Sequence, residues 1–440
     1  KETFSRRSQK ETRSRRCRRS IRTKARLTRA ARSPPRAAGP ATTAPLTPRR
    51  GANVDELRES AEWSNRTGGM RAAAFTTSHA RVATEKRLMH NATAAGQPGR
   101  AFRALIVHPK EAKEAPPRHQ VAEVQSLDDL PAERQLPAGG RTTVRIQFST
   151  LNYKDGMVLQ GQPGVAKSFP IVPGIDFVGT VEACEAGKWQ PGQQVLLTGN
   201  FAGQHIHGAY AELCRVPAEW LVPKPDSLSP EETMLIGTAG FTAMQSIIWL
   251  ERAGKLKPDS TLLVTGASGG VGSTAVAIAH HLGYKNIVAS TGRVEENQEL
   301  LRKLGATEVI GRLEAGRPLD AERYDAAIDT VGGSTLAAVL SQLKYGGAVA
   351  CSGVAGGPKL PASVFPFILR GVSLLGVDSV QLPQAERLAV WDRLARDFPR
   401  NYFDLVRNEP VDLEALGSLS QRILAGQVTG RVLVDVRPKL

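Results

Sequence analysis

Residues 260–284 read STLLVTGASGGVGSTAVAIAHHLGY, and this stretch decides the fold class. The apolar run predicts a buried strand, Gly266, Gly269 and Gly272 predict a tight turn, and the alanine-rich run predicts a helix. Glycine lets the backbone approach a pyrophosphate, and the free N–H groups at the start of the helix would face the phosphates. Strand, turn and helix in this order therefore predict a dinucleotide-binding unit.

The alternation of strand and helix continues on both sides of this unit. Upstream, SPEETMLIGTAGFTAMQSIIWLERAG (229–254) predicts a helix with Ser229 as N-cap and Pro230 in its first turn. Downstream, a helix ending at Gly305 and the strand candidates NIVAS, TEVI, YDAAIDT, GGAVACSGV and VSLLGVDSV follow. We therefore predict a Rossmann domain, a doubly wound parallel sheet, over residues 229–376.

The end of the second strand of this domain selects the cofactor. An NAD site usually places Asp or Glu there, bonded to the ribose 2′-hydroxyl. Here the strand ends in Ser290-Thr291-Gly292-Arg293, and no carboxylate comes before Glu295. Hydroxyl groups and a planar cation suit a phosphate, so we predict that the cofactor is NADPH.

Residues 101–228 have a different pattern, with short strands separated by Gly and Pro. Val144, Ile146 and Phe148 alternate with polar residues, as in a half-buried strand. This stretch predicts a small β-barrel-type domain. Residues 377–440 predict one helix, PQAERLAVWDRLARDF, and a last strand that returns to the first domain.

The ligand pattern of a zinc site is missing from the sequence. The chain has four cysteines that stand singly, without a CxxC pair: Cys17, Cys184, Cys214 and Cys351. His205 and His207 have no carboxylate or thiolate beside them, so we expect no metal. Without a Lewis acid, hydride addition to an activated double bond is favoured over alcohol oxidation.

The net charge of +16 is distributed unevenly along the chain. Residues 1–100 carry 24 Lys and Arg against 7 Asp and Glu, whereas residues 101–440 carry 34 against 35. The basic, Ser-rich leader predicts disorder and is typical of a transit peptide to a mitochondrion or plastid; without such a signal the protein is expected in the cytoplasm. The near-neutral charge of residues 101–440 argues against nucleic-acid binding. The sequence contains no run of about 18 apolar residues, so we expect no membrane-spanning helix.

Nine motifs occur in one order along residues 101–440. They are STLNYKD (149–155), FPIVPGIDFVGTV (169–181), LLTGN (196–200), GTAGFTAM (237–244), VTGASGGVGSTAVA (264–277), AIDTVGG (327–333), VAGG (354–357), PFILRGVSLLGVDSV (366–380) and TGRVLV (429–434). With them the chain resembles the acrylyl-CoA reductase type of the zinc-independent quinone oxidoreductase branch, within the medium-chain dehydrogenase/reductase superfamily. Residues 1–100 have no counterpart in this resemblance.

The resemblance implies an α/β fold in which a GroES-like β-barrel-type catalytic domain accompanies the Rossmann domain. It implies NADPH-dependent reduction of the 2,3 double bond of an acyl-CoA thioester, acrylyl-CoA, to propanoyl-CoA. The cofactor residues that it implies are Gly269, Gly270, Val271, Gly272, Ser273, Ser290, Gly292, Arg293, Ser352, Gly353 and Arg431. The loop of residues 152–155 is expected to line the cleft between the domains.

Reduction of an enoyl thioester produces an enolate, which needs a hydrogen-bond donor at its oxygen and a proton at its α-carbon. Tyr153 is the candidate donor, since a phenol donates without carrying a charge; water is the alternative proton source. Asn152 would orient the substrate or the nicotinamide ribose. Asp155 is expected to be a turn or helix-cap residue, and Asp176 a structural residue.

Two other functions remain open from the sequence. The protein could reduce quinones or small enones, or it could bind NADPH without catalysis, in which case a basic face should mark a nucleic-acid partner. The strand GVSLLGVDS at the sheet edge is expected to pair with a second subunit in a homodimer.

Overall fold

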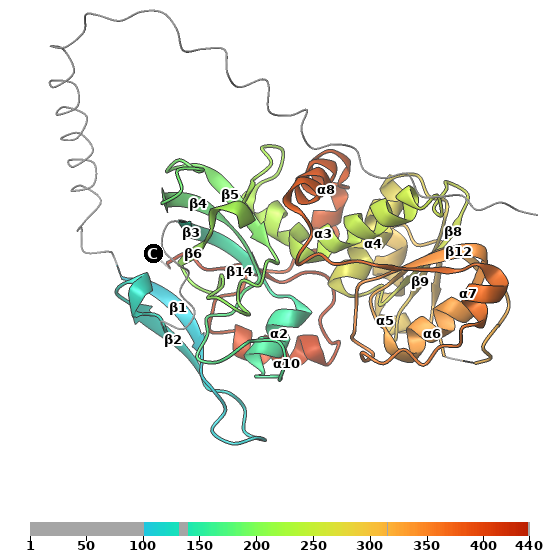
Figure 1. Ribbon diagram of the computed structural model, residues 1–440, viewed down its shortest axis with the longest axis horizontal. Helices are drawn as coiled ribbons and strands as arrows, with labels where there is room; N and C mark the ends of the chain where they lie inside the picture. Colours follow the sequence, from blue (N-terminus) through green and yellow to red (C-terminus); the bar gives the residue numbers. More distant parts are fainter. Residues whose placement is uncertain (1–100, 132–139, 315, 439–440) are drawn as a thin grey trace, which may run out of the picture. The chain divides into compact units, whose positions relative to one another are not determined.

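The computed structural model describes residues 101–131, 140–314 and 316–438 (Figure 1). The predicted basic leader, residues 1–100, lies outside the described residues. The described chain contains a β domain, a Rossmann domain and a C-terminal segment that contacts both. Together they confirm the predicted α/β fold class.

The β domain is built on antiparallel strands. β1 (Phe102–Val107) pairs with β2 (His119–Val124), and the larger sheet has the order β14-β3-β4-β5-β7, with β6 also paired to β3. The strands of the larger sheet are β3 (Arg141–Thr150), β4 (Asp176–Cys184), β5 (Gln194–Thr198), β6 (Leu213–Pro217), β7 (Val222–Pro223) and β14 (Leu433–Asp435). Val144, Ile146 and Phe148 of β3 are all buried, which confirms the predicted alternation.

The Rossmann domain is one six-stranded sheet in which every pair is parallel. Its order is β10 (Glu308–Ile310), β9 (Asn286–Ser290), β8 (Thr261–Thr265), β11 (Tyr324–Asp329), β12 (Leu343–Cys351) and β13 (Ser373–Gly376). The connecting helices are α4 (Gly270–His281), α5 (Val294–Lys303), α6 (Gly333–Gln342) and α7 (Phe365–Arg370). Successive residues of β8 enter different apolar clusters: Leu262 and Val264 pack in one, Leu263 in another. Both faces of the sheet are therefore covered, as the doubly wound prediction requires.

α3 (Pro230–Arg252) begins at the predicted N-cap, Ser229, but it is not one straight helix. Gly237 interrupts it with φ 49° and ψ −158°, a conformation that favours glycine. The N–H of Thr238 donates to the carboxylate of Asp176 at 2.7 Å. α3 is long and apolar enough to span a membrane, but 89% of its most apolar window is buried inside the fold, as in a core helix.

The predicted loop at residues 152–155 is instead the start of a helix, α2 (Tyr153–Leu159). Asn152 is its N-cap, and the Asp155 carboxylate at the third helical position accepts the Asn152 N–H. α10 (Leu416–Leu424) packs beside α2 (Figure 1), and a Cβ on Gly156 would lie 2.8 Å from Ile423 Cγ2. α10 was not among the helices predicted from the sequence, although its apolar residues recur at helical spacing.

The C-terminal segment continues through α8 (Gln384–Asp397) and α9 (Asn401–Val406) to β14, which pairs with β3 (Figure 1). Arg387 of α8 is fully buried. Its Nη1 donates to the Thr198 carbonyl at 2.7 Å, and its Nη2 donates to the Val380 carbonyl at 2.9 Å. One side chain therefore fixes the end of β5 to the segment that leaves the Rossmann domain.

Candidate active site

The N-terminus of α4 follows the Gly-rich turn and offers unbonded N–H groups. Its N-cap, Gly269, has no side chain to close the helix, and the Ser273 N–H already donates to the Gly269 carbonyl at 2.9 Å. The N–H groups of Gly270, Val271 and Gly272 stand at the first three helical positions, where no intrahelical acceptor exists. These donors and the positive end of the helix suit a pyrophosphate.

Close contacts at this turn leave no room for side chains. A Cβ on Gly272 would lie 2.7 Å from Ala267 Cα, and a Cβ on Gly270 would lie 2.7 Å from Arg431 Nη1. At Gly270 and Gly272 the turn therefore presents only backbone to its surroundings. This cradle fits the dinucleotide that the sequence predicts.

Ser273 follows the three glycines of the turn and lies inside the fold. Its side chain is fully buried, and the hydroxyl lies 3.4 Å from the Gly270 carbonyl oxygen and 3.5 Å from the Tyr402 hydroxyl. Its N–H is already bonded within the helix. The Ser273 side chain therefore lies in the packing of α4 against α9, and its predicted contact with the cofactor stays a prediction.

The end of β9 carries two residues that we predicted to contact the ribose phosphate. The Ser290 hydroxyl donates to the Gly311 carbonyl at 2.9 Å, in the chain that follows β10, and its predicted contact with the cofactor stays a prediction. Arg293 pairs with Glu296 at 2.8 Å and donates to Thr429 Oγ1 at 3.3 Å. The ion pair of Arg293 is partly exposed and can exchange, whereas the donor of Ser290 is already used.

A second arginine, which the sequence analysis missed, reaches the same place. β10 pairs with β9 so that Ile310 lies opposite Ser290, and the chain after β10 therefore passes the end of β9. A Cβ on Gly292 would lie 2.8 Å from Arg312 Nη2, so this guanidinium lies against the Gly292 backbone. Within the described part of the chain, Arg312 makes no hydrogen bond or ion pair. The sequence feature that could have indicated Arg312 is its position just after a strand that pairs in parallel with β9.

Ser352 and Gly353 directly follow β12 at the edge of the sheet that also holds the Gly-rich turn. The Ser352 N–H donates to the Asp329 carbonyl at 2.9 Å. A Cβ on Gly353 would lie 2.6 Å from Thr330 Cα, so the chain passes close to the end of β11. Ligands of such sheets bind at this carboxyl edge, which supports the predicted placement of both residues near the cofactor.

Arg431 is 3% exposed and joins the phosphate turn to the start of α2. Its Nε donates to the Leu235 carbonyl at 3.0 Å, and its Nη2 donates to Thr150 Oγ1 at 3.0 Å. Both Nη atoms lie 3.3 Å from Asn152 Oδ1, and Nη1 also lies against Gly270. Burial lowers the pKa of this guanidinium and nearby tyrosines and carboxylates oppose the shift, but an arginine stays charged. The turn therefore has a fixed cation beneath it.

Asp176 completes this network from β4. Its buried carboxylate accepts from Asn152 Nδ2 at 2.9 Å and from both the N–H and the hydroxyl of Thr238. Burial raises the pKa of Asp176, and these donors together with the charge of Arg431 oppose the rise. The Asn152 amide also donates to Asp155 at 3.3 Å, so all its groups have protein partners. This favours a positioning role for Asn152; its predicted catalytic role stays a prediction.

The first residues of α2 face different surroundings. Tyr153 is 36% exposed, and its hydroxyl has no hydrogen-bond partner among the described residues. Asp155 is fully buried and accepts the N–H groups of Asn152 and Ile175, both at 3.0 Å. Burial and, to a lesser extent, the nearby Asp176 carboxylate raise the pKa of Asp155 to about 7. The accessible phenol of Tyr153 is thus carried by a helix start that buried hydrogen bonds of Asp155 hold in place.

Comparison with known proteins gives the family. Residues 138–226 match the alcohol dehydrogenase GroES-like domain, and residues 270–396 match the family described as zinc-binding dehydrogenase. The chain is 45% identical over 339 residues to acrylyl-CoA reductase AcuI of Ruegeria pomeroyi, covering 76% of this chain and 99% of the relative. The chain belongs to the acrylyl-CoA reductase family. This family lies within the medium-chain dehydrogenase/reductase superfamily, as the resemblance of the motifs implied.

Two solved structures share the fold of this acrylyl-CoA reductase family chain. The yhdH oxidoreductase of Salmonella enterica, in complex with NADP, is 44% identical with a TM-score of 0.70, covering 76% of this chain and all of the other. The Bacillus subtilis protein yhfP, with NAD bound, is 38% identical with a TM-score of 0.70, covering 77% and 100%. YhfP is assigned to the quinone oxidoreductases. Because these relatives contain different dinucleotides, the end of β9 becomes the place to test cofactor choice.

The histidines of the acrylyl-CoA reductase family chain do not gather with other metal ligands in the described ranges. No group of three His, Cys, Asp or Glu side chains lies together there in a metal-binding arrangement. The Val172 N–H donates to His207 Nδ1 at 3.1 Å, and the His205 ring stacks on Phe201 with centroids 4.3 Å apart. The carboxylate of Asp176 is occupied by its own donors.

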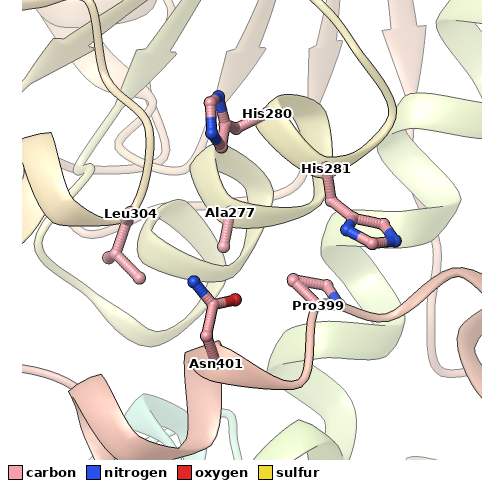
Figure 2. A pocket seen from close by; sticks show the side chains of 6 residues that line it. All are labelled: Ala277, His280, His281, Leu304, Pro399 and Asn401. Atoms are coloured by element: carbon pink, nitrogen blue, oxygen red, sulfur yellow. The ribbon is translucent and has the colours of Figure 1, made fainter.

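A pocket of about 330 Å³ opens at the other end of α4 (Figure 2). It is lined by Ala277, His280, His281, Leu304, Pro399 and Asn401. His280 is ten residues along α4 from Gly270, which is about 15 Å at 1.5 Å per residue. Figure 2 shows the two imidazoles pointing apart, and no carboxylate lines the pocket. We therefore assign the active site to the Gly-rich turn and the start of α2.

Proposed function

We propose that this protein is an NADPH-dependent reductase of enoyl thioesters that converts acrylyl-CoA to propanoyl-CoA. The observation that carries the proposal is the contact of Arg431 with both Gly270 and Asn152. It joins the dinucleotide turn to the helix that presents Tyr153. The 45% identity to an acrylyl-CoA reductase supports the substrate class, and the NADP complex of the Salmonella relative supports the cofactor.

The end of β9 supports NADPH rather than NADH. Arg312 lies against Gly292 without a protein partner in the described ranges, and Arg293 is held by a partly exposed pair with Glu296 and a hydrogen bond to Thr429. Two guanidinium groups flanking the end of this strand suit a 2′-phosphate. No carboxylate stands where an NAD site would hold the ribose hydroxyls.

Bound NADPH would supply the hydride that adds to the β-carbon of the substrate. The residues of the chain then stabilise the negative charge that develops on the thioester oxygen. Tyr153 is suited to this task because its phenol donates without a charge and is not bonded to another described residue. Asn152, Asp155 and Asp176 hold the helix that carries it, so the donor is positioned before substrate binds.

A reductase of quinones or small enones is the second candidate, favoured by the 40% identity to YhfP. The CoA part of a thioester substrate separates the two functions, because remote binding energy raises the rate of chemistry at the reacting centre. Non-catalytic NADPH binding is the third candidate. Residues 101–440 carry 34 basic and 35 acidic groups, so their charge gives it no support.

The test is oxidation of NADPH by the full chain with acrylyl-CoA, crotonyl-CoA and a simple quinone in parallel. We expect kcat/KM for acrylyl-CoA to exceed that for the quinone, and to fall sharply when the CoA is truncated to a short thioester. The Tyr153→Phe variant should lose roughly 10- to 1,000-fold in kcat if the phenol stabilises the enolate. A higher kcat/KM for the quinone would establish the second candidate.

A further inference from the structure

Lys154 is the second residue of α2 and stands between Tyr153 and Asp155. The start of this helix is held by Asn152, whose amide is bonded to Arg431 and Asp176. The backbone of Lys154 is therefore fixed next to the network that touches the phosphate turn. The side chain is half-buried, unlike that of Lys303 on α5, which is exposed.

Three carboxylates from three segments interact electrostatically with the Lys154 ammonium: Asp155 of α2, Asp176 of β4, and Asp378 in the chain after β13. Each already accepts from other donors. Ile175 N–H donates to Asp155, Thr238 N–H to Asp176, and Val380 N–H to Asp378. Lys154 itself makes no hydrogen bond or ion pair with any described residue. It is a half-buried cation without a fixed partner among the described residues.

The environment of this lysine favours release of a proton. Burial lowers the pKa of Lys154 from its ordinary value, and the three carboxylates only partly oppose that shift. A lysine whose pKa is lowered toward the working pH transfers its proton more readily than an ordinary one. Since the ammonium has no bond to break within the protein, its proton is available to a ligand.

We propose that Lys154 is the general acid that protonates the α-carbon of the substrate, an inference that rests on the proposed function. After the hydride has formed the new C–H bond at the β-carbon, the former double-bond electrons reside in the enolate. That electron pair takes a proton from Lys154 Nζ, so the Cα–H bond forms, the Nζ–H bond breaks and the thioester carbonyl is restored. The neutral amine then takes a proton from solvent.

Tyr153 and Lys154 thereby have separate tasks on one helix turn. The phenol donates a hydrogen bond to the thioester oxygen, while the ammonium delivers the proton to carbon. Consecutive helical residues point about 100° apart, which suits two targets on the same substrate. The division explains why one helix start presents two side chains that have no hydrogen-bond partner among the described residues.

The test compares Lys154→Met, Lys154→Arg and Tyr153→Phe in the full chain with acrylyl-CoA. We expect Lys154→Met to reduce kcat roughly 100- to 10,000-fold. Lys154→Arg should reduce kcat by a similar factor, because a guanidinium keeps its proton. In D₂O the wild type should place deuterium on one face of the α-carbon, and Lys154→Met should place it on both. The alkaline fall of kcat, expected when the acid loses its proton, should disappear in Lys154→Met.

NADPH affinity, measured by fluorescence titration, should stay within about twofold of the wild-type value in both Lys154 variants. Lys303→Met, on the exposed face of α5, is the control for the loss of a positive charge. Wild-type turnover and stereochemistry in Lys154→Arg would show that charge alone is needed and would overturn the inference. So would stereospecific deuteration in Lys154→Met that is lost in Tyr153→Phe. A wild type that reduces quinones but no enoyl thioester would overturn the proposed function itself, and the inference with it.

Discussion

The guanidinium of Arg431 lies against the backbone of Gly270, so that a Cβ at Gly270 would be only 2.7 Å from Nη1. Arg431 lies two residues before β14, whereas Gly270 is the first residue of α4. The two meet because the C-terminal segment returns to the β domain and passes beneath the Gly-rich turn. The chain end therefore forms part of the cofactor cradle, although it lies outside the Rossmann domain.

Gly270→Ala should weaken NADPH binding, because the new methyl group would push a buried guanidinium out of its hydrogen bonds with Asn152 and Thr150. Overpacking of this kind costs roughly 1–3 kcal/mol, which is about 5- to 150-fold in affinity. Fluorescence titration with NADPH measures the effect. Gly140→Ala is the matched control, since nothing lies within 4 Å of the position of the new methyl group and Gly140 lies outside the turn. Equal losses in both variants would show that the Arg431 contact is irrelevant.

Arg312→Ser should raise KM for NADPH roughly 10- to 100-fold while leaving KM for NADH nearly unchanged, because a charge-assisted hydrogen bond contributes about 1.5–3 kcal/mol. Arg293→Asp should act in the same direction but less strongly, because Arg293 also pairs with Glu296. Steady-state kinetics with both cofactors give the answer. Parallel changes for NADH and NADPH would remove these arginines from 2′-phosphate recognition.

Much of this arrangement was predictable from sequence, because local patterns determine it. The Gly-rich turn, the N-cap at Ser229 and the alternation in β3 depend on neighbouring residues, and all three are confirmed. The loop predicted at residues 152–155 was wrong because the helix start there is completed by Asp155, three residues after the N-cap.

The rest depends on contacts between distant segments. Arg312 reaches Gly292 only because β10 pairs in parallel with β9. Likewise, the kink at Gly237 exists because Asp176, from another domain, takes the Thr238 N–H. Glycine is a poor helix former and tolerates a positive φ, so the sequence permits a break at Gly237, and the tertiary hydrogen bond stabilises the break there.

Asp155 should make stability depend on pH near neutrality. Its pKa is about 7 in the folded protein against an ordinary value of 3.8, so the folded state holds the proton more tightly. Its contribution to stability is complete below about pH 4 and is lost as the pH rises through 7, at up to about 1 kcal/mol for each pH unit. In Asp155→Asn, Tm should therefore fall less between pH 5 and pH 8 than in the wild type. Calorimetry at four pH values tests this, and identical slopes would contradict it.

The exposed edge of the Rossmann sheet should pair with a second copy of the chain. β13 is the last strand in the order of the described sheet, so one side of its backbone is unpaired there. Beside it, α7 exposes Phe365, Ile368 and Leu369 at 45, 69 and 57%. An open edge flanked by an apolar surface is typical of a symmetric interface.

We therefore expect the mass of a homodimer in light scattering. Ile368→Asp should shift the protein toward the monomer, because a dimer would bury two uncompensated carboxylates. Gln298→Asp introduces the same charge on the exposed face of α5, near the other edge of the sheet, and should leave the mass unchanged. A monomeric wild type would exclude this interface. Ile368 is far along the chain from α2 and makes no contact in the described network of Arg431. Loss of the dimer should therefore leave NADPH affinity nearly intact. An unchanged affinity in Ile368→Asp would show that cofactor binding does not depend on assembly.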